Sequence, residues 1–234
     1  MTNRPAFIEH RAFARFLPYL QSYVLKGLQE VKTNGSKFKA TEQEFYAANV
    51  FERAGELDNS VKSLRLATAF VLDLKSTHED APDVYRYHHE NFLLRLTGTV
   101  DRAHLLVGAS LLLSPSKLKK IGANEFVAKS IALDYPELHE CLNRLLATVA
   151  KHKSARNEVA HSNAFSTREL GLFSAVVSLN IDVGDETEFN DLMDSHFSKS
   201  GAELALLVAD LVSGIEALLD ALVPIHENLF AGNA

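Results

Sequence analysis

The residues of this chain best suited to chemistry lie in one short segment, residues 151 to 162. Arg156, Asn157 and His161 follow one another within two helical turns. A guanidinium group can bind a phosphate by charge-assisted hydrogen bonds, and histidine exchanges protons near neutral pH. We therefore expect Arg156, Asn157 and His161 to form a candidate catalytic site.

The same segment is locally basic although the chain as a whole is acidic. Lys151, His152 and Lys153 are consecutive, and the first acid after them is Glu158. The net charge of the 234-residue chain is -6. A small electropositive surface in an acidic protein is suited to a phosphate, so we expect Lys151, His152 and Lys153 to bind substrate.

A helical wheel places the arginine in an unusual position. If a helix that begins at Glu137 continues to His161, Arg156 falls near the centre of an apolar stripe made by Leu145, Val149 and Ala160. A buried and unpaired guanidinium is costly, so it needs a carboxylate, a phosphate or a partner protein. Structural alternatives stay open, because an arginine can extend its head group out of an apolar stripe and a histidine often caps a helix end.

Composition limits the class of protein. The chain is long enough for one large domain, 1–234, and 47% of its residues are hydrophobic. The negative net charge argues against a protein that coats nucleic acid through a global positive field, although a local patch is compatible with it. A single cysteine, Cys141, excludes an internal disulfide and a multi-cysteine zinc site, and we expect it to be a buried apolar residue.

The distribution of charge also bears on location. Charged residues interrupt every apolar run near the N-terminus, so the chain lacks the core of a signal peptide. No later stretch supplies the roughly 20 apolar residues that a membrane span needs. We expect a soluble, cytoplasmic protein with no membrane partner.

Hydrophobic periodicity predicts long helices joined by short loops, which is typical of an all-α antiparallel helical bundle. Pro18 should kink or split a first helix over residues 6–31, and Thr41 with Glu44 three residues later forms a capping-box pattern. Further helices are expected over 41–74, 83–113, 125–133, from 137 towards the basic segment, and over 201–229. His88 and His89 are expected on the surface.

The segment from residue 165 to 200 is the least regular. Val177, Leu179, Ile181 and Val183 alternate with polar residues, which favours a short extended segment near 176–183. A helix over 167–177 followed by an extended loop fits almost as well. Six acids between residues 182 and 194 are most simply explained as a solvated loop.

The pattern Arg156-Asn157-x-x-x-His161 resembles the signature of the HEPN superfamily, in which arginine is followed by a polar residue and then by histidine four to six residues beyond the arginine. The all-helical pattern and the chain length are also similar to a HEPN domain. Asn91-Phe92-x-x-Arg95 and Asp101-Arg102 in an earlier helix resemble one prokaryotic branch of toxin or defence type.

The resemblance implies a metal-independent endoribonuclease, a toxin or antiviral effector that needs no cofactor and acts as a homodimer. In that family the arginine and histidine of two protomers meet in a composite cleft. His161 would then act as the general acid or base, Arg156 would bind the scissile phosphate, and Asn157 would orient the ribose or phosphate. RNA would be the substrate, and a toxin of this kind would have an antitoxin protein as partner. No tyrosine follows His161 closely, so control by nucleotidylation is not supported.

Two alternatives remain open at this stage. Many HEPN members are noncatalytic modules that bind RNA or protein, and the sequence does not separate them from the enzymes. A di-metal carboxylate bundle would use Glu158-x-x-His161 and Asp101-x-x-His104, two pairs at one-turn spacing on different helices. The two further glutamates that such a site needs cannot be assigned.

Overall fold

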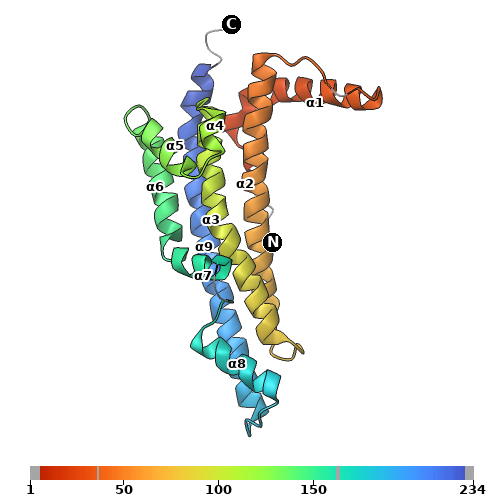
Figure 1. Ribbon diagram of the computed structural model, residues 1–234, viewed down its shortest axis with the longest axis vertical. Helices are drawn as coiled ribbons and strands as arrows, with labels where there is room; N and C mark the ends of the chain where they lie inside the picture. Colours follow the sequence, from red (N-terminus) through yellow and green to blue (C-terminus); the bar gives the residue numbers. More distant parts are fainter. Residues whose placement is uncertain (1–5, 36, 162–163, 230–234) are drawn as a thin grey trace. The chain divides into compact units, whose positions relative to one another are not determined.

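The computed structural model describes residues 6–35, 37–161 and 164–229, and it confirms the all-α prediction. The described residues form helices and connecting loops, with no strand among them (Figure 1). In chain order the elements are η1 (Phe7–Glu9), η2 (Arg11–Phe16), α1 (Leu17–Lys32), α2 (Glu42–Asp73), α3 (Ala81–Ser110), α4 (Pro115–Leu118), α5 (Ala123–Ile131), α6 (Pro136–Ala150), α7 (Lys153–His161), α8 (Arg168–Leu179) and α9 (Glu186–Leu229).

The first predicted helix is split beside Pro18, as expected. Two short 3-10 helices, η1 and η2, precede α1, and Pro18 occupies the first turn of α1, where its missing N–H costs no hydrogen bond. The buried carboxylate of Asp58 on α2 accepts hydrogen bonds from the backbone N–H groups of Phe7 (2.8 Å) and Ile8 (3.1 Å). These hydrogen bonds hold η1 against α2.

The capping box at the start of α2 is confirmed. The Glu44 backbone N–H donates to the Thr41 hydroxyl (3.2 Å), and the Thr41 backbone N–H donates to the Glu44 carboxylate (2.8 Å). Two backbone donors at the helix start, which would otherwise lack partners, are thereby satisfied.

The prediction of an extended segment near 176–183 is wrong for its first half, because α8 continues through Leu179. Thr167 caps this helix, accepting a 3.1 Å hydrogen bond from the Leu170 N–H, and Asn180 ends it in a left-handed conformation with φ of 48°. The alternating Val177 and Ile181 are both exposed, so no half-buried face exists to favour a strand.

The acidic segment 182–194 is also different from the solvated loop that we expected. Helix α9 begins at Glu186, fifteen residues before the predicted start at 201. The Asp185 carboxylate accepts hydrogen bonds from the backbone N–H groups of Thr187 and Glu188, both at 3.0 Å. Acids at a helix N-terminus are stabilised by the helix dipole, which explains why this acidic run is helical.

The chain divides into two compact units, and each has its own core; the predicted single domain stays a prediction. Unit 1 comprises residues 1–59, 100–145 and 213–234, and unit 2 comprises 60–99 and 146–212. In unit 1, His226 donates from Nδ1 to the Ala12 carbonyl (2.9 Å) and packs against Phe16. The other large buried side chains of unit 1 include Phe13, Tyr46, Leu57, Leu106, Ile131, Leu142, Ile215 and Leu219.

Unit 2 is built around Tyr85. Its ring stacks on Phe197 with centroids 4.9 Å apart, and its hydroxyl donates to Ser200 on α9 (2.7 Å). Leu64, Phe92, Leu96, Leu170, Phe173, Leu204 and Leu211 complete the buried core. Within the described residues, none of the helices is long and apolar enough to cross a membrane.

Candidate functional site

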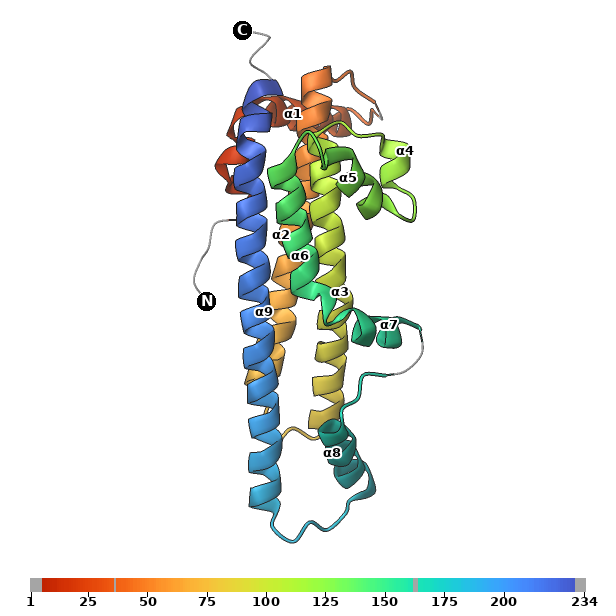
Figure 2. The same ribbon diagram turned by 90° about the vertical axis from the view of Figure 1, so that its left-hand side faces the viewer.

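The predicted catalytic residues and Lys153 lie on α7, a separate short helix of nine residues in unit 2, and Lys151 and His152 form the turn before it. Helix α6 ends at Ala150, two turn residues follow, and α7 begins at Lys153 (Figure 2). The helix therefore does not continue unbroken from Glu137 to His161, and the stripe drawn on that assumption is wrong. Val149 is buried but Ala160 is exposed, because the turn gives α7 a new direction.

Arg156 nevertheless lies in a partly buried position. Its Nη1 donates to the Oδ1 of Asn157 (3.1 Å). Its Nε is buried and has no hydrogen-bond partner, and no carboxylate pairs with the guanidinium, among the residues that the structure describes. Arg156 and Asn157 are thus brought together, while the guanidinium retains donors for an anion.

His161 is the last residue of α7 and is exposed. It lies one helical turn after Asn157, which is also exposed, so both share one flank of the helix. Arg156 and His161 are five residues apart, about 140° around the helix, and accordingly one is half-buried and the other exposed. The structure does not bring the two side chains together within one copy.

The three predicted substrate-binding residues divide into two kinds. Lys151 and Lys153 are exposed, whereas His152 is half-buried with its Nε2 enclosed and without a hydrogen-bond partner among the described residues. Burial and the neighbouring Lys151 lower the pKa of His152. The two lysines therefore supply the positive charge of this surface, and burial disfavours the charged form of His152.

Sequence analysis did not group three half-buried histidines of unit 2: His89 on α3, His152 in the turn before α7, and His196 on α9. Burial, together with the influence of His152 and His196, lowers the pKa of His89 to about 4. His89 is not the surface residue that we expected. It stacks on Phe165 with centroids 4.0 Å apart, while His88 stacks on Phe70.

One face of α3 holds the chain that follows α7. Phe165 donates its backbone N–H to the Glu90 carboxylate (2.6 Å), and its carbonyl accepts from Arg86 Nε (3.2 Å). Arg86 Nη2 also donates to the Ser174 hydroxyl on α8 (2.9 Å). Arg86, His89 and Glu90 have the three- and four-residue spacing of one helix face, which is the signal that could have identified them.

The polar residues of α3 that carried part of the resemblance are exposed or partly exposed, whereas Phe92 is buried in the core of unit 2. Arg95 Nε donates to the Asn91 Oδ1 (2.6 Å), so this pair is satisfied locally. In unit 1, the Asp101 carboxylate accepts from Asn124 (2.6 Å), and Arg102 is partly exposed.

The geometry does not favour the di-metal alternative. His104 is fully buried and its Nδ1 lies 2.9 Å from the Val100 carbonyl, whereas Asp101 is exposed. Consequently this pair does not present a carboxylate and an imidazole to one point. Among the described residues, no group of three or more histidine, cysteine, aspartate or glutamate side chains could hold a metal ion.

Comparison with known proteins supplies no relative. No protein-family model, no curated protein and no solved structure matches the chain.

Proposed function

We propose that the protein is a metal-independent endoribonuclease of HEPN type, a toxin or antiviral effector, with Arg156, Asn157 and His161 as its site. The observation that carries the proposal is the state of Arg156: a partly buried guanidinium that lacks a carboxylate partner among the described residues and is held by Asn157. A positioned cation without a counter-ion is suited to a phosphate.

The chemistry follows from the side chains of α7. Arg156 would bind the scissile phosphate and stabilise the negative charge that develops on its oxygens during 2′-hydroxyl attack. His161, exposed at the helix end, would accept the 2′-hydroxyl proton or donate a proton to the leaving oxygen. Lys151 and Lys153 would bind flanking phosphates, which makes RNA affinity dependent on salt.

A composite site between two copies would explain the geometry of Arg156 and His161. Because these residues point about 140° apart on one helix, the arginine and the histidine of one α7 do not converge. Arg156 of one copy and His161 of a second copy can converge across a two-fold axis, where residue contacts are reciprocal. The proposal therefore includes a homodimer that contacts through α7.

The test is cleavage of single-stranded RNA by the purified protein with a metal chelator present. Arg156→Ala and His161→Ala should each reduce the cleavage rate by about 100-fold or more, because each removes a group that acts in the transition state. Arg168→Ala and His78→Ala are matched controls at exposed positions of the same unit and should cleave like wild type. Circular dichroism and thermal unfolding would show that all four variants fold.

Mixing the two inactive variants tests the composite site. Heterodimers of Arg156→Ala and His161→Ala chains contain one site with both groups intact, so activity should return to a fraction of wild type. Cleavage that persists in both folded single variants would refute the proposal. RNA binding without cleavage by the wild-type protein would favour a noncatalytic RNA-binding module instead.

A further inference from the structure

Unit 1 contains a cavity that the proposed function does not use. It lies between the start of α2, the end of α3 and α4, and its volume is about 1110 Å³. Large apolar side chains make up much of its lining, among them Phe38, Phe45, Leu105, Leu112, Leu113 and Leu118. The volume is just above the range of about 300 to 1,000 Å³ that is usual for small-ligand sites, so the cavity can hold a large ligand.

The cavity extends along one face of α2. Thr41, just before the helix, and Phe45, Asn49 and Arg53 within it all line the cavity. Because they follow one another at intervals of four residues, they lie on the same side of the helix. At a rise of about 1.5 Å per residue, the cavity follows α2 for about 18 Å. An elongated cavity of this length suits a ligand with a long chain.

The end of the cavity at Arg53 is polar. Arg53 is half-buried, and its Nη1 donates to the Glu56 carboxylate (2.9 Å). Its other N–H donors have no partner among the residues that the structure describes. Asn49, one turn earlier, is also half-buried, and its side-chain amide has no hydrogen-bond partner in the same part of the chain. The remaining donors of the guanidinium and the amide can together hold a carboxylate.

The connections beside the cavity are basic. Residues 37–41 contain two lysines, residues 111–122 contain three, and neither segment contains an acid, although the net charge of the chain is -6. Lys119 lines the cavity, as does one acid, Glu42, in the exposed first turn of α2. The local positive charge attracts an anion to this part of unit 1, and the half-buried Arg53 is placed to bind it.

Leu112, which also lines the cavity, has a strained backbone with φ of 54°. It ends α3: the Leu113 N–H donates to the Gly108 carbonyl (2.9 Å), and the Leu112 N–H donates to the Ala109 carbonyl (3.1 Å). Glycine is the usual residue at this position of a helix end, because a side chain is unfavourable at positive φ. The side chain of Leu112 is 65% exposed, so it contributes little to the core. A strained residue of this kind indicates a role in binding.

We propose that this cavity binds a long-chain carboxylate such as a fatty acid. Arg53 and Asn49 hold the head group, and the hydrocarbon chain lies along Phe45 and Leu112. Two polar side chains at one end match a single anionic head, and the elongated apolar lining matches an unbranched chain. The proposal is independent of the proposed ribonuclease function, which concerns α7 of unit 2.

Titration calorimetry of the full chain with laurate, below the concentration at which laurate forms micelles, is the first test. The wild-type protein should bind one laurate per chain. Dodecyltrimethylammonium has a chain of the same length with a cationic head, and it should bind about tenfold more weakly or worse, because Arg53 repels it. Acetate has the carboxylate without the chain and should show no binding, because it buries no apolar surface.

Two variants test the two ends of the ligand. Arg53→Gln removes the charge that holds the carboxylate and should weaken laurate binding by about tenfold or more. Arg15→Gln makes the same change at an exposed position of unit 1 outside the cavity and should bind like wild type. Leu112→Gly removes an apolar contact and the backbone strain together, so it should weaken laurate binding by about tenfold without lowering the melting temperature. A purely structural role of Leu112 would produce the opposite pair of results.

Four results would overturn the proposal. The first is a wild-type protein that does not bind laurate. The second is equal affinity for laurate and dodecyltrimethylammonium, which would exclude a site for an anionic head. The third is laurate binding that Arg53→Gln or Leu112→Gly leaves unchanged, which would place the ligand elsewhere. The fourth is sedimentation of the chain with anionic phospholipid vesicles without binding of monomeric laurate, which would assign the basic connections to a membrane surface. RNA cleavage, measured separately, would be unaffected by any of them.

Discussion

The cationic side chains of helices α1 and α7 differ in whether they have a carboxylate partner. On α1, Lys26 is paired with Glu44, whose carboxylate is also filled by Ser22 and Thr41. On α7, Arg156 has a buried Nε without a partner among the described residues, and its guanidinium contacts an amide, not a carboxylate. A cluster whose polar groups have partners stabilises one structure. A cation without an anionic partner can instead bind a ligand.

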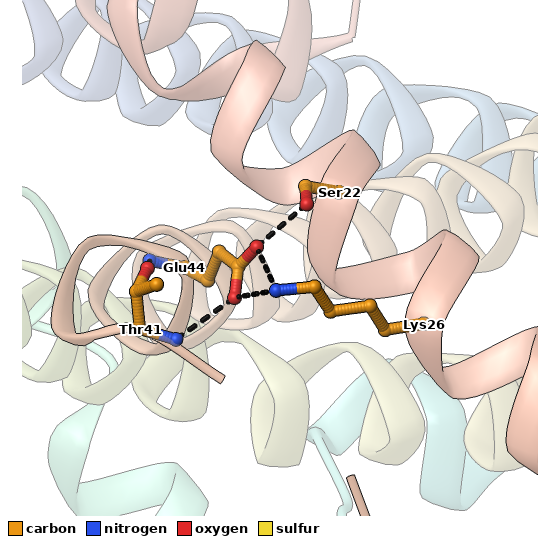
Figure 3. Close-up of polar contacts among 4 residues, drawn as sticks. All are labelled: Ser22, Lys26, Thr41 and Glu44. Atoms are coloured by element: carbon orange, nitrogen blue, oxygen red, sulfur yellow. Dashed lines mark hydrogen bonds and ion pairs between the residues drawn. The ribbon is translucent and has the colours of Figure 1, made fainter. Parts of the chain in front are cut away.

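The exposed faces of the two helices differ in the same sense. The apolar side of α1 is exposed to solvent, whereas the exposed residues of α7 include Lys153, Asn157 and His161. We therefore expect substitutions in the cluster of Ser22, Lys26, Thr41 and Glu44 (Figure 3), here called the Glu44 clasp, to change stability without changing the chemistry of α7. Substitutions on α7 should do the reverse.

The largest effect on stability is expected from Glu44→Gln. The substitution keeps the size of the side chain but leaves Lys26, which is 40% exposed, without its counter-ion, and it replaces the buried carboxylate that accepts from Ser22 and Thr41 by a neutral amide, which is destabilising. The melting temperature should fall by about 10 °C in thermal unfolding. RNA cleavage by the folded protein should be unchanged.

Two further variants test whether the ion pair between Lys26 and Glu44 accounts for this loss of stability. Glu52→Gln makes the same charge change at an exposed position of α2 and should leave the melting temperature close to that of wild type. Lys26→Met combined with Glu44→Gln should recover part of the loss, because the double variant leaves no unpaired charge. A melting temperature of Glu44→Gln equal to that of wild type would show that the clasp does not hold α1.

The features of α1 and α2 that depend on contacts between residues close in sequence can be predicted from the sequence. Thr41 and Glu44 are three residues apart, so the capping box and the start of α2 were visible as a pattern, as was the split beside Pro18. Ser22 and Lys26 reach Glu44 from 22 and 18 residues away, and no periodicity reports such a pairing. The exposure of Leu17, Val24 and Val31 on α1 is likewise not visible in the periodicity, which is the same for a buried and an exposed apolar stripe.

The α7 site was predictable in its residue types but not in its geometry. Arg156, Asn157 and His161 were identified from spacing, yet no glycine or proline marks the turn at residues 151 and 152 that separates α7 from α6. The anchoring of Phe165 by Arg86 and Glu90 spans more than 70 residues, and it became visible only in three dimensions.

Glu44 beside α1 and His89 beside the α7 site should also contribute to stability in different pH intervals. An unfolded histidine binds a proton near pH 6.5, but buried His89 does so only near pH 4, so the unfolded state binds more protons between these values. The free energy of unfolding should therefore fall as the pH drops from 6.5 to 4, by about 3 kcal/mol from His89. The contribution of Glu44 is present above pH 4.5 and is lost only as the pH falls towards 2.

Urea unfolding at a series of pH values would measure this difference. His89→Phe retains an aromatic ring to stack on Phe165 and removes one titrating group, so it should reduce the decline between pH 6.5 and 4 without abolishing it, because the pKa of His226 is also lowered to about 4. Glu44→Gln should leave that interval unchanged and alter the profile below pH 4.5. An equally steep decline in His89→Phe would mean that other histidines, such as His226, account for it.

The smallest effects are expected from two matched helix caps, one in each region. Thr41 caps α2 beside the clasp and Thr167 caps α8 after the α7 site, each accepting a backbone hydrogen bond, at 3.2 and 3.1 Å. Thr41→Ala and Thr167→Ala should each cost about 1 kcal/mol in chemical denaturation, the usual value for such a cap. The Thr41 backbone N–H still donates to Glu44 in the alanine variant, so the ion pair with Lys26 survives. A cost for Thr41→Ala as large as that of Glu44→Gln would show that the cap hydroxyl, and not the charge of Lys26, holds α1 in place.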